Sequence, residues 1–345
     1  MDTSAGGTLA SPTETGALGI CWVKRFWSRS RAARRGAHAP ASSQERLLDM
    51  LVIDAVGLGL EQTAEYFGTF DPDFAEFERW IVQTTGGVDP LRVARINALV
   101  LGKDAPAQVA RWLDSIDAAD PVLSPDDLAF WNEHGYVVLH DAVPVASRDA
   151  AARAVFDNLD ADPADPETWY RPRRHGIMVQ YFQHPAFEAN RRSPRIHKAF
   201  AQLWGTSDLW VTTDRVGFNA PERAGAKFPG PDLHWDVSLK TPIPLGTQGI
   251  LYLTDTPPEQ GAFTLVPGFH RRVDQWLASL PTGADPRCQD LHALGSRPIG
   301  GRAGDLIIWH HALPHGSRPN RGDRPRVVQY IAMYPAWREV QDIWI

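Results

Sequence analysis

The second half of the sequence is a series of short hydrophobic runs separated by turn-forming residues. The runs "LWVTTDRVGF", "LHWDVSL", "GILYLTD", "AFTLVPG", "DLIIWHH" and "RVVQYIAMY" alternate between apolar and polar residues or are continuously apolar, and Gly, Pro, Asn and Asp stand between them. Runs of this kind are typical of strands, and many short strands predict a sandwich or a barrel. We therefore expect a mainly β core, with helices packed outside it.

The sequence divides into three segments by composition and periodicity. Residues 1–45 carry six basic and three acidic residues, so this leader has a net charge of +3 in a chain whose net charge is −6. Residues 46–118 repeat apolar residues at three- and four-residue spacing, which predicts helices. Residues 119–345 hold the predicted strands and open with a helix that begins after Ser124 and stops at Gly135. We expect a flexible basic leader, a helical extension that acts as a cap, a dimerisation element or a lid, and one β domain.

Composition and charge limit the classes of function. The net charge of −6 and the lack of a basic stripe in the body of the chain argue against nucleic-acid binding. The apolar stretch of the leader, residues 16–23, is too short to span a membrane, and basic residues follow rather than precede it. Two cysteines, Cys21 and Cys288, are too few for a disulfide framework. We expect a cytoplasmic monomer or homodimer that acts on a small molecule, with an organelle transit peptide as the alternative use of the Arg-rich leader.

One of the predicted strands, "PDLHWDVSL", carries a possible metal-binding pair. In an extended chain His234 and Asp236 lie on one face while Trp235 points to the other. His315, far downstream in "WHHALPHGSRPN", is the candidate third ligand. Two histidines and one carboxylate leave positions open on an octahedral metal, which is the ligand set of non-haem Fe(II) oxygenases, whereas zinc more often takes thiolates or three histidines.

A hairpin after His315 would bring an arginine beside the metal. If the chain turns at residues 320–321, His315 lies directly opposite Arg326 on the next strand. A guanidinium next to a metal ligand is suited to hold an anion that is itself bound to the metal, so Arg326 is predicted to be an anion anchor. His310 and His311 compete as ligands, but their position indicates the end of a buried strand.

These motifs resemble the phytanoyl-CoA dioxygenase family of Fe(II)- and 2-oxoglutarate-dependent oxygenases. The likeness covers roughly residues 124–336 and rests on the order of H-x-D, "GAFTLVPGFH", "AGDLIIWH" and "HGSRPN", followed by an arginine eleven residues after the second histidine. The resemblance implies an α+β chain with a double-stranded β-helix core of the jelly-roll or cupin-like type. It also implies that His234, Asp236 and His315 bind iron, that Arg326 pairs with the far carboxylate of 2-oxoglutarate, and that O2 is the oxidant.

The resemblance extends to further co-substrate contacts. Ser317 is expected to add a hydrogen bond, and Asn219 in "FNAP" matches an asparagine at a strand end of the family. Tyr252 stands near the place of a frequent tryptophan and is expected to substitute for it. Ala220 and Phe269 replace the usual lysine and serine, so a substrate like phytanoyl-CoA is not expected.

The substrate site is predicted from two stretches of the sequence. "WYRPRRHGIMVQYFQ", residues 169–183, combines aromatic and basic groups, and Arg174, Gln180 and Tyr181 are its candidate pocket residues, with an ordinary core role as the alternative. Arg215 would place a buried cation near the metal if its side chain faces inward. Such a cation indicates an acidic substrate.

The resemblance implies hydroxylation of a small organic substrate, with release of succinate and CO2. The carboxylate at position 236 favours hydroxylation, because a small residue there would open a halide site, as in related halogenases. Two other interpretations stay open. One is a cupin-type metal-dependent hydrolase or isomerase, which gives Arg326 no purpose. The other is a non-catalytic β-helix binding protein, but the complete set of metal ligands argues against it.

Overall fold

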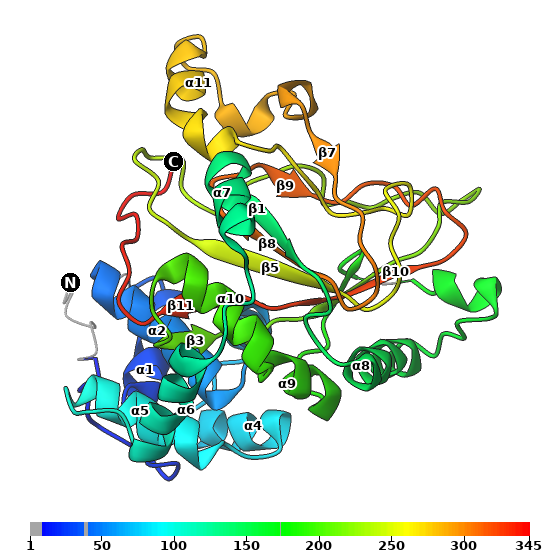
Figure 1. Ribbon diagram of the computed structural model, residues 1–345. Coiled ribbons are helices and arrows are strands. Elements are labelled where there is room, and N and C mark those ends of the chain that lie inside the picture. Colours follow the sequence, from blue (N-terminus) through cyan, green and yellow to red (C-terminus); the bar gives the residue numbers. More distant parts are fainter. Residues whose placement is uncertain (1–8, 38–40, 173) are drawn as a thin grey trace. The chain divides into compact units, whose positions relative to one another are not determined.

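The computed structural model describes residues 9–37, 41–172 and 174–345, and its contacts divide the chain into two units (Figure 1). Unit 1 comprises Met1–Ala118 with Pro335–Arg338, and unit 2 comprises Ala119–Tyr334 with Glu339–Ile345. Helices hold 40% of the described residues and strands 14%. The chain is therefore a mixed α/β protein with antiparallel sheets, and it is richer in helix than the expected mainly β chain.

Unit 1 consists of helices joined by short loops. Ser42 and Asp73 cap two of them by accepting the backbone N–H three residues on, and Asp89 caps a third in front of Pro90. No helix among the described residues is long and apolar enough to cross a bilayer. The helices are α1 (Val23–Arg34), α2 (Ser43–Val56), α3 (Leu60–Thr69), α4 (Phe74–Thr85), α5 (Pro90–Val100) and α6 (Ala107–Ala118).

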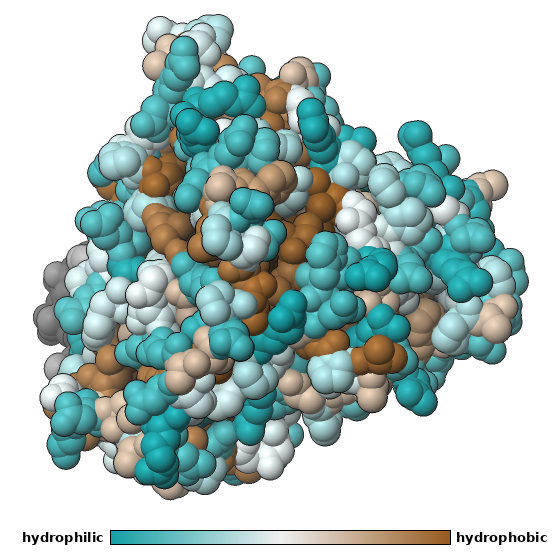
Figure 2. Space-filling model, viewed as in Figure 1, coloured by the Kyte–Doolittle hydropathy of each residue, from teal (hydrophilic) through white to brown (hydrophobic). Residues whose placement is uncertain are grey.

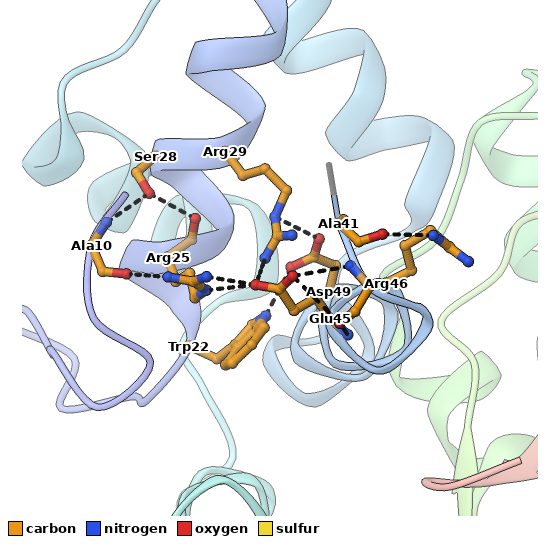
Figure 3. Close-up of polar contacts among 10 residues, drawn as sticks. Ala10, Trp22, Arg25, Ser28, Arg29, Ala41, Glu45, Arg46 and Asp49 are labelled. Carbon is orange, nitrogen blue, oxygen red and sulfur yellow. Dashed lines mark hydrogen bonds and ion pairs between the residues drawn. The ribbon is translucent and has the colours of Figure 1, made fainter. Parts of the chain in front are cut away.

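The described part of the leader, residues 9–37, is folded into unit 1. It contains α1, and Trp22 at the start of this helix is 4% exposed. Trp22 Nε1 donates to Asp49 Oδ1 on α2 at 2.8 Å, and Arg25 Nε donates to Glu45 Oε1 at 3.1 Å (Figure 3). The prediction of a flexible leader is therefore wrong for residues 9–37, while residues 1–8 and 38–40 lie outside the described residues.

Several basic residues of the leader pair with acidic residues of the helical segment that follows. Arg31 Nε lies 2.6 Å from Asp71 Oδ1, and Arg35 Nη2 lies 2.7 Å from Asp71 Oδ2. The hydrogen bond from Arg25 lowers the pKa of Glu45 to about 2. A local charge count could not predict this packing, because the compensating charges come from the helical segment that follows.

Unit 2 contains two main antiparallel sheets and a small pair. The six-stranded sheet has the order β1 (Tyr136–Leu139), β8 (Leu306–His310), β5 (Thr247–Tyr252), β10 (Arg326–Tyr330), β4 (Val216–Asn219), β2 (Met178–Val179). The three-stranded sheet has the order β7 (Arg297–Pro298), β6 (Thr264–Leu265), β9 (His315–Gly316), and β11 (Met333–Pro335) pairs with β3 (Leu209–Val211). The α-helices are α7 (Pro125–His134), α8 (Val145–Asn158), α9 (Pro185–Arg191), α10 (Pro194–Trp204) and α11 (Val273–Ser279), and short 3-10 turns span Pro166–Tyr170, Phe269–Arg271, Pro286–Cys288 and His292–Leu294.

The two faces of the six-stranded sheet have different neighbours. On one face Gln329 Nε2 donates to the carbonyl of Phe187 on α9, at 2.9 Å. The other face, here called the inner face, carries Arg326, Val328 and Tyr330, because alternate residues of β10 point the same way. In unit 2, α8, α9 and α10 lie on one side of this sheet and β9 and β7 on the other (Figure 1). Hydrophobic side chains also gather on the visible surface beside α7, near β8 and β5 (Figure 2).

The predicted hairpin between His315 and Arg326 is wrong. In β9, His315 lies opposite Leu265 of β6, whereas in β10 Arg326 lies opposite Asn219 of β4. The chain passes from the three-stranded to the six-stranded sheet between these residues instead of folding back on itself. The two residues therefore stand on facing sheets, and Arg326 Nη1 reaches Ser317 Oγ across the gap at 3.0 Å.

His310 at the end of β8 is half-buried, and its surroundings favour the neutral ring. Burial lowers its pKa to about 3, and the nearby His311 and His270 add to the effect. Its Nδ1 accepts the backbone N–H of Ala312 at 3.0 Å, and the ring stacks on His270 with centroids 5.3 Å apart. His310 thus packs at the end of its strand, and the group of possible metal ligands among the described residues contains neither His310 nor His311.

The low pKa of His310 predicts a loss of stability in acid. In the unfolded chain the His310 imidazole binds a proton below about pH 6.5. In the folded chain it binds a proton only below about pH 3. As the pH decreases from about 6.5 to about 3, the free energy of unfolding should therefore decrease, by at most about 1.4 kcal/mol per pH unit. We expect His310→Asn, which keeps an acceptor for Ala312, to flatten the pH dependence of urea unfolding by about one proton. An unchanged slope would contradict this origin of acid sensitivity.

Candidate active site

His234, Asp236 and His315 converge in unit 2. One ligand atom from each side chain lies within 4.8 Å of the others. Residues 231–239 do not form the regular strand that was expected; His234 makes an isolated bridge to His315, with N–H to O distances of 2.9 and 3.0 Å in the two directions. A side chain at Gly316 would place its Cβ 2.4 Å from the Asp232 carbonyl oxygen, so glycine permits this close approach.

The backbone orients both imidazoles. His234 Nδ1 lies 2.7 Å from the Asp232 carbonyl oxygen, and His315 Nδ1 lies 3.0 Å from that of Leu313. Because a carbonyl oxygen only accepts, each Nδ1 must carry a proton. The Nε2 atoms of both rings are thereby left to face Asp236, which is the arrangement of metal-binding histidines with a backbone partner.

The Asp236 carboxylate lies between the two rings. Its Oδ1 is 3.3 Å from His234 Nε2 and its Oδ2 is 3.2 Å from His315 Nε2. Burial opposes ionisation, but hydrogen bonds from His234 and then His315 hold the pKa of Asp236 far below its usual range. Burial likewise opposes protonation of His234, and its bonds to Asp236 and to the Asp232 carbonyl nevertheless raise its pKa. Positive charge is therefore favoured between these three groups, as protons or as a metal ion that displaces them.

Two residues that support the metal-binding group were not predicted from the sequence. Arg287 Nη1 donates to the Trp235 carbonyl at 3.0 Å and Nη2 donates to the Val237 carbonyl at 2.7 Å, so it holds the backbone on both sides of Asp236. Gln248 Nε2 on β5 donates to Asp236 Oδ2 at 2.8 Å. Neither residue follows a local motif, because each comes from a segment remote from the H-x-D sequence. Trp235 itself is buried and points away, as expected, with Nε1 on the Ala312 carbonyl.

Arg326 forms a second buried polar site on the inner face. Its side chain is fully buried, and Nη1 donates to the Gly261 carbonyl at 2.8 Å and to Ser317 Oγ at 3.0 Å. The other two guanidinium atoms, Nε and Nη2, have no hydrogen-bond partner among the described residues. These two N–H groups form the edge of the guanidinium that binds a carboxylate in bidentate fashion.

Two predicted co-substrate residues have structural contacts instead. Asn219 Nδ2 donates to the Arg318 carbonyl at 3.0 Å, which fixes the segment between β9 and β10. The Tyr252 hydroxyl donates to the Ile299 carbonyl at 2.6 Å and accepts from Phe263 N–H at 3.0 Å. Both side chains are buried. The structure thus gives Asn219 and Tyr252 positions next to the Arg326 site and engages their polar groups within the protein.

The predicted substrate residues are distributed unevenly. Tyr181 packs edge-on against Phe187 of α9, with ring centroids 5.1 Å apart, and its assignment to the pocket stays a prediction. Arg215 precedes β4 opposite Tyr330, whose N–H donates to the Arg215 carbonyl, so its side chain belongs to the inner face. Burial lowers the pKa of Arg215, opposed by Tyr330 and Asp236. Arg174 is exposed and Gln180 is half-buried, and both stay predicted pocket residues.

Comparison with known proteins adds a family match. A family model described as phytanoyl-CoA dioxygenase (PhyH) matches residues 131–328, which is more than half of the chain and includes all three candidate ligands and Arg326. A Dictyostelium discoideum protein named as a candidate phytanoyl-CoA dioxygenase is 23% identical over 258 residues, 60% of this chain and 74% of that one. Ava biosynthesis cluster protein O of Aspergillus versicolor is 25% identical over 206 residues, 51% of this chain and 65% of that one.

Solved structures of similar chains include SnoK and HygX. The non-heme alpha-ketoglutarate-dependent carbocyclase SnoK from nogalamycin biosynthesis aligns with a TM-score of 0.46 and 21% identity, over 65% of this chain and 90% of that one. HygX of Streptomyces hygroscopicus, solved with nickel, 2-oxoglutarate and hygromycin B, aligns with a TM-score of 0.45 and 18% identity, over 62% and 88%.

Proposed function

The chain belongs to the phytanoyl-CoA dioxygenase family, and from this premise we propose that it hydroxylates a small organic substrate with iron(II), 2-oxoglutarate and O2. The proposed reaction inserts one oxygen atom of O2 into a C–H bond and places the other in succinate, with release of CO2 from 2-oxoglutarate. Iron(II), when bound, supplies the activation of O2 that couples these two oxidations. The protein binds and orients the reactants and excludes water.

The observation that carries this proposal is the unsatisfied edge of Arg326. A buried guanidinium with two unpartnered N–H groups is costly to stability, because each unmade bond forfeits about 1–3 kcal/mol. A carboxylate satisfies both groups at once, and 2-oxoglutarate carries a second carboxylate and a keto oxygen at its other end to reach the metal. Ser317 and the Gly261 carbonyl hold Nη1 and so fix the plane of the guanidinium.

The donor atoms of the metal group fit iron(II). His234 and His315 present Nε2, since both Nδ1 atoms are engaged by carbonyls, and Asp236 is ionised. Two imidazoles and one carboxylate leave ligand positions free for 2-oxoglutarate and O2. In this proposal His315 and Arg326 bind opposite ends of the co-substrate from facing sheets.

We also propose that the two main sheets of unit 2 are the halves of a double-stranded β-helix. Support comes from the hydrophobic cluster on the inner face, which joins Ile250, Ile307 and Val328 of the six-stranded sheet to Leu265 of β6. Sheets that share a core in this way enclose a site between them. The metal group and Arg326 both lie at this shared core.

For the substrate we propose an anionic group directed at Arg215. Its guanidinium is half-buried on the inner face, and both Asp236 and Tyr330 influence its pKa. A half-buried cation close to the metal group is suited to bind a carboxylate or a phosphate and to place a neighbouring C–H bond near the iron. Arg174 and Gln180 stay predicted pocket residues.

The proposal is tested by succinate release from 2-oxoglutarate by the iron-loaded protein. Organic acids and their neutral amides are added in matched pairs, and His234→Ala serves as the control. We expect the acids to stimulate succinate formation in the wild type and not in the variant. Bound metal without succinate formation would favour a hydrolase or isomerase, and no bound metal would favour a binding protein.

A further inference from the structure

Gln248 hydrogen-bonds to the Asp236 carboxylate from outside the metal group. It stands on β5 directly opposite Trp309 of β8, two residues before Ile250, and so belongs to the inner face. The distance from its Nε2 to Asp236 Oδ2 is 2.8 Å. Asp236 follows a segment without regular strand pairing, so its side chain depends on such contacts for a fixed position.

The chemistry of the contact fixes the orientation of the amide. An ionised carboxylate only accepts hydrogen bonds, so the NH2 group of Gln248 must face Asp236. The amide oxygen Oε1 then points away, and it is buried without a partner among the described residues. A buried unsatisfied acceptor costs stability, about 1–3 kcal/mol. An apolar residue would pack at this place on the inner face without that cost, which argues for a functional reason for glutamine.

We propose that Gln248 is a positioning residue for the metal centre: its amide occupies Asp236 Oδ2 and leaves Oδ1 to bind the metal as a single ligand atom. This inference rests on the proposed function, since it requires a metal at His234, Asp236 and His315. Restricting the carboxylate to one metal bond keeps another coordination position open. Partners of this kind typically change metal affinity about 10- to 100-fold.

The test measures Mn(II) affinity of the full chain by calorimetry, because Mn(II) binds iron sites without oxidation chemistry. Gln248→Met removes the amide at similar volume. We expect it to weaken Mn(II) binding about tenfold and to leave the melting temperature of the metal-free protein equal to or above that of the wild type. A role that is only structural would do the reverse, lowering the melting temperature and sparing the affinity.

Gln329→Met is the matched control, because Gln329 is a buried glutamine of the same sheet on the opposite face, bound to Asn190 and Phe187. It should lower stability and leave Mn(II) affinity unchanged; if it does not fold, Ile250→Val on β5 takes its place. Unchanged affinity in Gln248→Met with a wild type that binds Mn(II) overturns the role of Gln248 and leaves the proposed function standing. A wild type that binds no Mn(II) overturns both.

Discussion

His315→Ala should abolish both metal binding and substrate-stimulated succinate release. The variant loses an imidazole that the Leu313 carbonyl orients toward the metal, and the remaining pair, His234 and Asp236, cannot cover one face of an octahedral ion. Loss of a residue that only supports a ligand already costs 10- to 100-fold in affinity. We therefore expect metal affinity to fall by about a hundredfold or more, measured by Mn(II) calorimetry alongside a succinate assay.

His311→Ala is the control for this variant. His311 lies four residues earlier, and its Nε2 lies 2.7 Å from the Pro244 carbonyl oxygen, away from the metal group. The control should keep its metal affinity even if its melting temperature falls. Retention of wild-type affinity in His315→Ala, or equal losses in both variants, would rule out the assigned ligand set.

Arg326→Met should raise the KM for 2-oxoglutarate with little change in the stability of the unliganded protein. Two charge-assisted hydrogen bonds to a carboxylate are lost, about 3–6 kcal/mol together, which corresponds to about a hundredfold or more in affinity. In the absence of co-substrate the same change removes a buried, partly unsatisfied charge, and replacement of buried charges by apolar residues is often neutral or stabilising. The variant should therefore raise the KM for 2-oxoglutarate without lowering the stability of the unliganded protein.

The measurement compares melting curves with Mn(II), with and without 2-oxoglutarate, and the co-substrate dependence of succinate release. The wild type should be stabilised by 2-oxoglutarate and the variant should not. Arg324→Met is the matched control, since Arg324 is exposed two residues earlier. A variant at position 326 that keeps the wild-type KM would refute the assignment of the co-substrate carboxylate to this arginine.

Features whose cause is local could be predicted from the sequence. The helix of α7 follows from the Ser124 cap and the Gly135 stop, and the strand that begins at Tyr136 follows from its apolar run. The candidate ligands could be predicted from the H-x-D spacing and the order of the motifs. The helix, the strand and the His234–Asp236 pair depend on residues close together in the chain, whereas His315 was predicted through the resemblance to a family.

Features that depend on distant partners could not be predicted in this way. The hairpin after His315 followed from the assumption that neighbouring strands pair with each other, whereas β9 pairs with β6. The leader was expected to be flexible because of its basic composition, whereas Arg29 pairs with Asp49 and Arg31 with Asp71 of the helical segment. Gln248 and Arg287 support Asp236 through contacts that only the folded chain creates.

The separation of His315 and Arg326 on two sheets has a mechanical consequence. A diacid bound to a metal at one end and to Arg326 at the other would connect the two sheets. The hydrogen bond between Arg326 and Ser317 already connects them directly. Co-substrate bound in this way would link the two sheets through His315 and Arg326.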